Sequence, residues 1–343
     1  MLMDTVKALC PLFGPSGMED EVRDYIRREA EPYADKLIVT PNGTLLVFKK
    51  GRKAAKRCIL LAAHVDEVGV IVTSVTDAGF LRFAFVGGMD RRVVLGKKVF
   101  LGPNRIPGII GMKPIHLTDS SERERIPKVR DLYIDIGAKD RAEAETLVEE
   151  GTFGCFAPEI TELQNGFLRA KALDDRVGCA VLLETLKEEL PADTWFAFTV
   201  QEEIGSKGAF GAAFHVKPDV ALVLEGTSAA DTPGRDGADR VCMPCHGPVL
   251  SMMDKGSIYD PGLFRMLQKL AEERGIPWQI KTRIAGTTDA HAMQTNLSGC
   301  KVAGISVPLR YIHSPSCVGN VSDIEAVKTL TAAFLEKMED YDG

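Results

Sequence analysis

The segment Cys58-Ile-Leu-Leu-Ala-Ala-His64-Val-Asp66 decides the fold class of this chain. Its apolar run from Cys58 to Ala63 is short and continuous, as in strands that are buried on both faces of a parallel sheet. The run stops abruptly at His64, whose imidazole can bind a metal. In doubly wound α/β sheets the functional site lies at the carboxyl ends of such strands. The segment therefore predicts an α/β sheet whose strands carry polar side chains to one edge.

The residues before this strand predict two local elements. Ser16-Gly-Met-Glu19 is typical of a helix capping box and predicts a helix from Glu19 to about Ala30. Residues 36–40 and 44–49, joined by Pro41-Asn42-Gly43, predict a β-hairpin.

The residues after His64 predict an insertion in the α/β domain. From about Val68 to Leu163, short alternating runs are separated by turn signals, and one helical stretch covers 141–150. After Asp174 the α/β pattern returns, with helices expected at 175–189, 261–274 and about 322–338, and strands at 194–200, 219–224 and 305–311. We therefore assign residues 1–67 and 166–343 to a discontinuous α/β domain and residues 68–165 to an inserted β-rich domain.

The composition is that of an ordinary globular protein. The chain has 343 residues, of which 45% are hydrophobic and 26% charged, so it can form a sizeable core and disorder is excluded. Lysine and arginine total 42 against 48 aspartate and glutamate residues, which gives a formal net charge of -6. This balance argues against nucleic-acid or anionic-membrane binding and favours small or peptide substrates.

The cysteines and the apolar runs predict the cellular compartment. No apolar run approaches the roughly 20 residues that span a bilayer, and we expect no export signal. Eight cysteines are scattered along the chain, which favours free thiols in a reduced, cytoplasmic setting. Cys242-x-x-Cys245-His246 could form a zinc or redox pair, but no second pair follows at finger spacing, so ordinary buried or surface thiols are the simpler interpretation.

Metal-capable side chains follow the predicted buried strands. His64, the pair Glu202-Glu203 and Glu225 each come at a strand end, and the strand at 305–311 leads directly to His313. Asp174 stands just before a predicted helix. Each residue alone is more often structural or solvated, but their occurrence at four strand ends favours a shared site.

These residue types suit a pair of divalent metal ions. Imidazole and carboxylate ligands bind zinc, cobalt or manganese, and two neighbouring ions need five or six ligands, one bridging carboxylate and a free base. The five ligands would be His64, Asp174, Glu203, Glu225 and His313. Glu202 is left as the general base, and Asp66 is placed to orient the His64 ring. No Gly-x-Ser-x-Gly elbow or complete phosphate-loop spacing occurs.

Five ordered motifs resemble one enzyme family. They are His64-Val-Asp66-Glu-Val-Gly, Ala172-Leu-Asp174-Asp-Arg-Val-Gly, Gln201-Glu-Glu-Ile-Gly-Ser-Lys-Gly-Ala209, Gly286-Thr-Thr-Asp289-Ala and Arg310-Tyr-Ile-His313-Ser-Pro315. Over essentially the whole chain they resemble the dinuclear metallo-aminopeptidases called glutamyl, deblocking or tetrahedral aminopeptidases, which form metallopeptidase family forty-two. Some relatives in this family have been labelled endoglucanases.

The resemblance implies a catalytic domain similar to zinc aminopeptidases, with a mixed sheet flanked by helices, interrupted by a small PDZ-like domain that supports dimers. Such dimers often assemble into tetrahedral dodecamers. The resemblance also implies two divalent metal ions per subunit, one held by His64, Asp174 and Glu225 and the other by Asp174, Glu203 and His313. In the implied two-metal hydroxide mechanism Glu202 is the general base and Asp66 the orienting acid. A cis peptide bond would join Asp174 to Asp175.

Three departures from the family pattern bear on the substrate. Glu225 stands where many relatives have aspartate, Cys317 where an acidic residue is frequent, and His291 where a small residue is common. The sequence therefore predicts an aminopeptidase acting on peptides, with a dinuclear carboxypeptidase or deacylase on the same fold as the alternative. A glycoside hydrolase fits less well, because glycosidases use two carboxylates and generally no metal set. A non-catalytic assembly protein would not need the complete ligand set and base.

Overall fold

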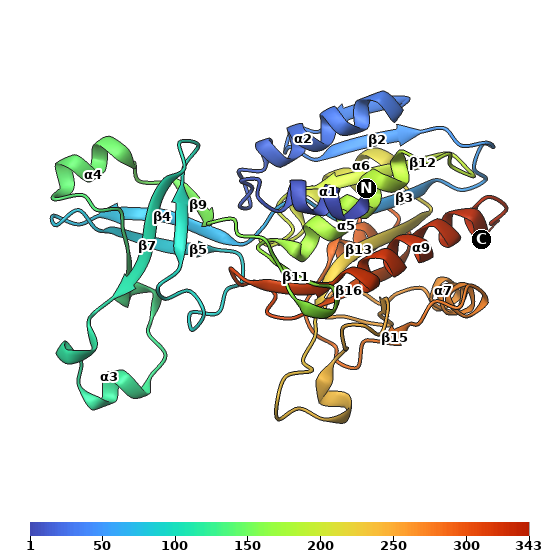
Figure 1. Cartoon of the computed structure of the whole chain (residues 1–343). Helices are drawn as coiled ribbons and strands as arrows, with labels where there is room; N and C mark the ends of the chain where they lie inside the picture. The colour runs from blue at the N-terminus through green and yellow to red at the C-terminus, as the bar shows by residue number, and fades with distance from the viewer. Residues whose placement is uncertain (343) are drawn as a thin grey trace.

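The computed structural model describes residues 1–342, which form a helix-covered sheet and a separate barrel (Figure 1). The helices are α1 Leu2–Leu9, α2 Asp20–Ala30, α3 Ser120–Glu124, α4 Arg141–Leu147, α5 Leu173–Leu186, α6 Lys207–Val216, α7 Pro261–Glu273, α8 Asp289–Thr295 and α9 Val321–Met338. Short 3-10 turns lie at Glu31–Tyr33, Ile115–Leu117, Val129–Asp131, Gln164–Gly166 and Gly237–Arg240. No helix in residues 1–342 is long and apolar enough to cross a membrane.

The main sheet has eight strands in the order β1-β2-β12-β3-β13-β16-β14-β15. Their bounds are β1 Lys36–Val39, β2 Leu45–Lys49, β3 Ile59–His64, β12 Thr194–Thr199, β13 Val220–Ser228, β14 Val249–Leu250, β15 Gln279–Ile280 and β16 Lys301–Leu309. The central strands β12, β3, β13 and β16 run parallel, whereas β2 and β14 join them antiparallel. The predicted mixed α/β sheet is confirmed, and so is the hairpin, which is β1 and β2.

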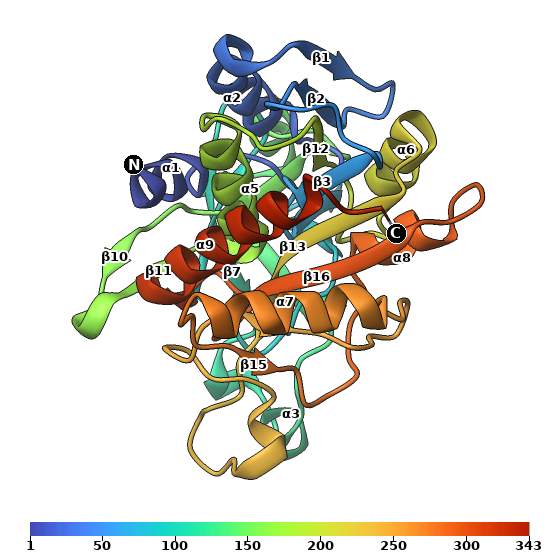
Figure 2. The same cartoon turned by 90° about the vertical axis from the view of Figure 1, so that its right-hand side faces the viewer.

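The two faces of the sheet carry helices of different character (Figure 2). On one face, α1, α2, α5, α7 and α9 cover a large core that includes Ile59 and Leu61 of β3. On the other, the alternate residues Leu60 and Ala62 pack against α6 and α8, whose buried positions are mostly alanine. Small side chains let α6 and α8 approach the sheet closely. Helix α5 is buried along its whole length, and its first turn carries the buried polar residues Asp174, Asp175 and Arg176.

The inserted segment forms a closed six-stranded barrel in the order β4-β5-β8-β7-β6-β9. Its strands are β4 Gly69–Val75, β5 Leu81–Val86, β6 Lys98–Leu101, β7 Ile106–Met112, β8 Leu132–Asp135 and β9 Phe153–Phe156, and they enclose a core of their own. In Figure 1 the barrel stands apart from the sheet. The chain returns through β10 Thr161–Glu162 and β11 Phe167–Ala170, which pair in a small sheet with β17 Cys317–Asn320.

The structure corrects several local predictions, among them the helix expected at 175–189, which is α5 and ends at Leu186. Strand β13 continues to Ser228 because it pairs with β16 as far as Leu309, so Glu225 lies within the strand and not at its end. Helix α4 ends at Leu147, three residues before the predicted end. The predicted helix after Glu19 is present as α2, but the capping box is wrong, since Glu19 is the N-cap residue and its side chain makes no capping hydrogen bond.

Candidate metal centre

The site is assembled by the carboxyl-end region of the parallel strands. His64 is the last residue of β3, and Glu202 and Glu203 follow β12. Glu225 lies in the C-terminal half of β13. His313 comes from the loop after β16, and Asp174 from the start of α5. The structure brings all five residues expected to bind metal into one cluster, as expected when parallel strands share an edge.

The five donors form two overlapping groups. In the first, the His64 Nε2 atom lies 3.4 Å from Asp174 Oδ1 and 3.6 Å from Glu225 Oε2. In the second, the His313 Nε2 atom lies 3.4 Å from Asp174 Oδ2 and 3.2 Å from Glu203 Oε1. Within each group the possible ligand atoms all lie within 4.8 Å of one another. Asp174 belongs to both groups and offers one oxygen to each.

The donor set fits divalent metal ions. Each group combines one imidazole with two carboxylates, the ligands that zinc, cobalt and manganese accept. Burial raises the pKa of Glu225 well above its usual range, and burial also raises the pKa of Glu203. Buried carboxylates in this number are costly unless cations neutralise them, so the charge of the cluster favours bound cations.

Both histidines are held by carboxylates. Burial lowers the pKa of His313, but its contacts with Asp174 and Glu203 outweigh burial and raise the value to about 11. His64 behaves in the same way: burial lowers its pKa, and the neighbouring Asp174 and Asp66 raise it well above the usual value. A histidine must lose its proton before it binds a metal, so each ion would compete with a proton here.

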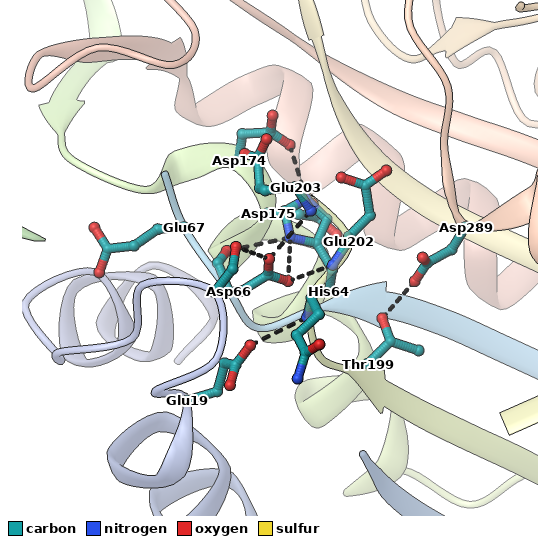
Figure 3. A network of polar contacts seen from close by, with 12 residues as sticks. Glu19, His64, Asp66, Glu67, Asp174, Asp175, Thr199, Glu202, Glu203 and Asp289 are labelled. Carbon is teal, nitrogen blue, oxygen red and sulfur yellow. Dashed lines mark hydrogen bonds and ion pairs between the residues drawn. The ribbon is translucent and has the colours of Figure 1, made fainter. Parts of the chain in front are cut away.

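Asp66 is fully buried and contacts both sides of the cluster (Figure 3). Its Oδ1 atom lies 3.4 Å from His64 Nδ1, and its backbone oxygen lies 3.2 Å from the same nitrogen. The carboxylate also accepts hydrogen bonds from the backbone N–H groups of Glu202 at 3.0 Å and Glu203 at 3.1 Å. The contact with Nδ1 agrees with the expected role of Asp66 in orienting the His64 ring. The two hydrogen bonds to the Glu202–Glu203 turn were not predicted from the sequence.

Glu202 lies beside both groups without belonging to either. It lines a cavity of about 420 Å³ together with Asp174, Glu203 and Glu225. Burial raises the pKa of Glu202 well above its usual range; His64 opposes this shift, and the nearby Asp289 carboxylate adds to it. In this position the Glu202 carboxylate holds a proton more readily than an exposed glutamate does.

Strained backbone surrounds the site residues. Ala172, Gln201, Tyr311 and His313 have φ values of 54°, 58°, 58° and 56°, in the left-handed region that non-glycine residues rarely adopt. No glycine marks these positions, so the sequence carried no signal for them. The expected cis peptide bond between Asp174 and Asp175 is present.

A group of buried charged residues near the cluster was also not predicted from the sequence. Glu67 forms ion pairs with Lys171 and, at 3.5 Å, with Arg176, and all three side chains are nearly inaccessible. Arg176 also donates to the backbone oxygen of Leu9 at 2.7 Å. The sequence could have indicated these ion pairs, because Glu67 closely follows His64 and because Lys171 and Arg176 flank Asp174.

The remaining candidates lie outside the two donor groups found in residues 1–342. The His291 Nδ1 atom lies 2.7 Å from the backbone oxygen of Gly256. Cys242 is buried with its thiol 3.4 Å from the Ser228 oxygen, and Cys245 is exposed. Cys317 is buried and lines a small cavity beside Asp174.

Comparison with known proteins agrees with this fold. The sequence pattern of the M42 glutamyl aminopeptidase family matches residues 43–330. A putative aminopeptidase of Acetivibrio thermocellus is 36% identical over 97% of this chain and 98% of its own length. An aminopeptidase structure from Desulfurococcus kamchatkensis is 34% identical, with a TM-score of 0.93 over 99% of this chain and 96% of that one. The TET1 peptidase of Pyrococcus horikoshii, described as assembling into a tetrahedron or an octahedral shell, is 33% identical, with a TM-score of 0.85 over 98% and 99%.

Fold, site and relatives define the chain as a hydrolase of peptide bonds that uses divalent metal ions. It belongs to the M42 glutamyl aminopeptidase family.

Proposed function

We propose that this protein is an aminopeptidase that removes N-terminal residues from peptides with the help of two divalent metal ions. The observation that carries the proposal is the pair of donor groups sharing Asp174, with Glu202 beside them and outside both. One bridging carboxylate plus a free base is the arrangement that dinuclear hydrolysis requires.

The proposed ligands divide as the donor groups do. His64, Asp174 and Glu225 would hold one ion, and Asp174, Glu203 and His313 the other. The bound ions, zinc or cobalt or manganese, would supply Lewis acidity that polarises the scissile carbonyl. Asp66 would orient His64 through the ring nitrogen that faces away from Asp174.

Glu202 would move the proton. One of its carboxylate oxygens accepts a proton from the attacking water and then donates it to the nitrogen of the leaving amine. The raised pKa of Glu202, caused first by burial, suits a group that must hold this proton between the two steps.

The charge of the cavity bears on which end of a peptide binds. Glu202 lines the cavity and belongs to neither donor group, so its carboxylate would be free to attract a protonated α-amino group. Lys281 and Arg283 line the same cavity and could instead meet a substrate carboxylate, which is the observation that favours the alternative, a carboxypeptidase or deacylase. Membership of a peptidase family gives the glycoside hydrolase alternative no support.

We also propose that residues 68–165 form a PDZ-like dimerisation domain and that residues 1–67 and 166–343 form the catalytic domain. The inserted domain exposes Ile115 and Leu117, which are 72% and 60% accessible, in the 3-10 turn between β7 and β8, and exposed apolar surface is typical of protein interfaces. Homo-oligomers, as dimers or a tetrahedral dodecamer, would follow. The eight free cysteines support a reduced, cytoplasmic setting.

The test is hydrolysis of short peptides with free and acetylated N-termini, using metal-stripped enzyme reloaded separately with zinc, cobalt or manganese. The proposal expects metal-dependent cleavage of the free-amine peptides alone. Cleavage of acetylated peptides or N-acyl amino acids would transfer the assignment to the carboxypeptidase or deacylase alternative.

A further inference from the structure

We propose that Glu19 is a positioning residue for this reaction: its carboxylate, together with that of Asp66, holds the turn that carries Glu202. The inference rests on the proposed role of Glu202 as general base. Glu19 lies 183 positions before Glu202, at the start of α2, and belongs to neither donor group.

Three consecutive backbone N–H groups of the turn donate hydrogen bonds to two buried carboxylates (Figure 3). Gln201 N donates to Glu19 Oε1 at 3.1 Å, while Glu202 N and Glu203 N donate to the two oxygens of Asp66. Glu19 is 5% exposed and Asp66 is fully buried. Consecutive N–H groups that point to one side form a concave anion-binding feature, and here side chains of the protein fill it.

The turn needs such support because its backbone is strained. Gln201 has a φ of 58°, a conformation that residues other than glycine keep only where the surrounding structure imposes it. This residue sets the direction in which Glu202 leaves β12. The carbonyl oxygen of Gln201 accepts from Lys207 N at 3.2 Å, and its N–H group donates to Glu19. The hydrogen bond to Glu19 is therefore the side-chain contact that holds the conformation immediately before the base.

The contacts of Glu19 are aimed at this turn and not at its own helix. Its side chain makes no capping hydrogen bond to α2. Its Oε1 atom also accepts from Gly17 N at 2.7 Å, and the nearby Ser16 hydroxyl donates to Asp66 Oδ2 at 2.6 Å. The Ser16–Glu19 motif thus ties the N-terminal segment to the two carboxylates that hold the base.

Two substitutions of Glu19 distinguish the loss of its hydrogen-bond acceptor from the loss of its side-chain volume. Glu19→Met keeps the length but removes the oxygen, and we expect kcat to fall about 10- to 100-fold with KM within about twofold, as for a displaced catalytic group. Glu19→Gln keeps an oxygen that can accept from Gln201 N, and it should retain at least about a third of kcat. Glu31→Met, at an exposed glutamate beyond the other end of α2, is the matched control and should leave kcat unchanged.

A second measurement does not depend on activity or on metal. Hydrogen exchange of the peptide covering residues 200–206 in metal-free protein should be faster in Glu19→Met than in wild type, and unchanged in Glu19→Gln and Glu31→Met. If Glu19→Met does not fold, Glu19→Ala carries the same expectations, and the rescue by Glu19→Gln still tests the acceptor.

Wild-type kcat and exchange in Glu19→Met would overturn the inference, and so would a Glu19→Gln variant as slow as Glu19→Met. Glu202→Gln is measured in parallel. If it stays active, the proposed base is wrong, whereas an inactive Glu202→Gln beside a fully active Glu19→Met removes only the role of Glu19.

Discussion

Asp66 shows how one buried residue can serve both halves of the candidate centre. Its carboxylate faces the His64 ring on one side and the Glu202–Glu203 amides on the other. Burial raises the pKa of Asp66, but His64, the Ser16 hydroxyl and the turn amides outweigh it and keep the pKa below the usual value. Asp66 therefore stays ionised, which suits an acceptor with four donors around it.

At this residue scale, Glu202→Gln separates chemistry from binding. The amide cannot take up a proton, so we expect kcat to fall about 100- to 10,000-fold while KM and bound metal stay close to wild type. Steady-state kinetics and metal analysis check this, with Glu273→Gln at the end of α7 as the control. A kcat near the wild-type value would show that another group moves the proton.

Metal uptake should depend on pH through His313. Its folded-state pKa of about 11 means that the metal-free protein holds this proton at neutral pH, so a metal ion must displace it. Apparent metal affinity should rise with pH, and calorimetry in buffers of different ionisation enthalpy should show proton release. Release that is the same in His313→Ala would contradict this source of the proton.

The same shift has a consequence for the stability of the metal-free protein. A histidine with a raised pKa stabilises the fold fully below its unfolded value of about 6.5, and this contribution is lost as pH rises toward about 11. Metal removal should therefore lower the Tm more at pH 9 than at pH 6, as thermal unfolding in the presence of chelator can show.

At the scale of elements, the alanine-lined face of the sheet sets how closely α6 approaches it. Ala212 is fully buried between α6 and the sheet core. Ala212→Leu should overpack this layer and cost about 1–3 kcal/mol, measured by chemical denaturation. Phe214→Leu, at a position on the same helix that is 61% exposed, should change the free energy of unfolding little. Equal effects of the two substitutions would show that the layer is not tightly packed.

The elements also show where local prediction stops working. Sequence patterns identified β1, β2, β12 and α9 closely, because hydrophobic periodicity and turn residues act over a few positions. Glu225 was expected at a strand end, yet β13 continues beyond it because β16 offers partners as far as Leu309. The length of a strand depends on its neighbour, which a single segment does not reveal.

At the scale of the whole molecule, the inserted domain carries the apolar surface proposed to join subunits, in the segment between β7 and β8. Ile115→Asp places a charge on an exposed apolar position of the inserted domain, and we expect a smaller assembly by light scattering with peptidase activity per site retained. Phe214→Asp, on the helical part of the catalytic domain, should leave the assembly size unchanged. Loss of assembly in Phe214→Asp alone would move the interface away from the barrel.

The sequence by itself determined the α/β class, the β-rich insertion and the residues gathered in the candidate centre, because periodicity and polar residues near strand ends are local properties of the chain. Only the tertiary structure decided that Asp174 offers one oxygen to each donor group and that Asp66 holds the Glu202–Glu203 turn. It also turned Ser16 and Glu19 from an expected helix cap into contacts with Asp66 and with Gln201, which is 182 positions away from Glu19. Hydrogen bonds between residues so far apart in the sequence depend on how the layers of the fold pack. A pattern within one segment therefore cannot predict them.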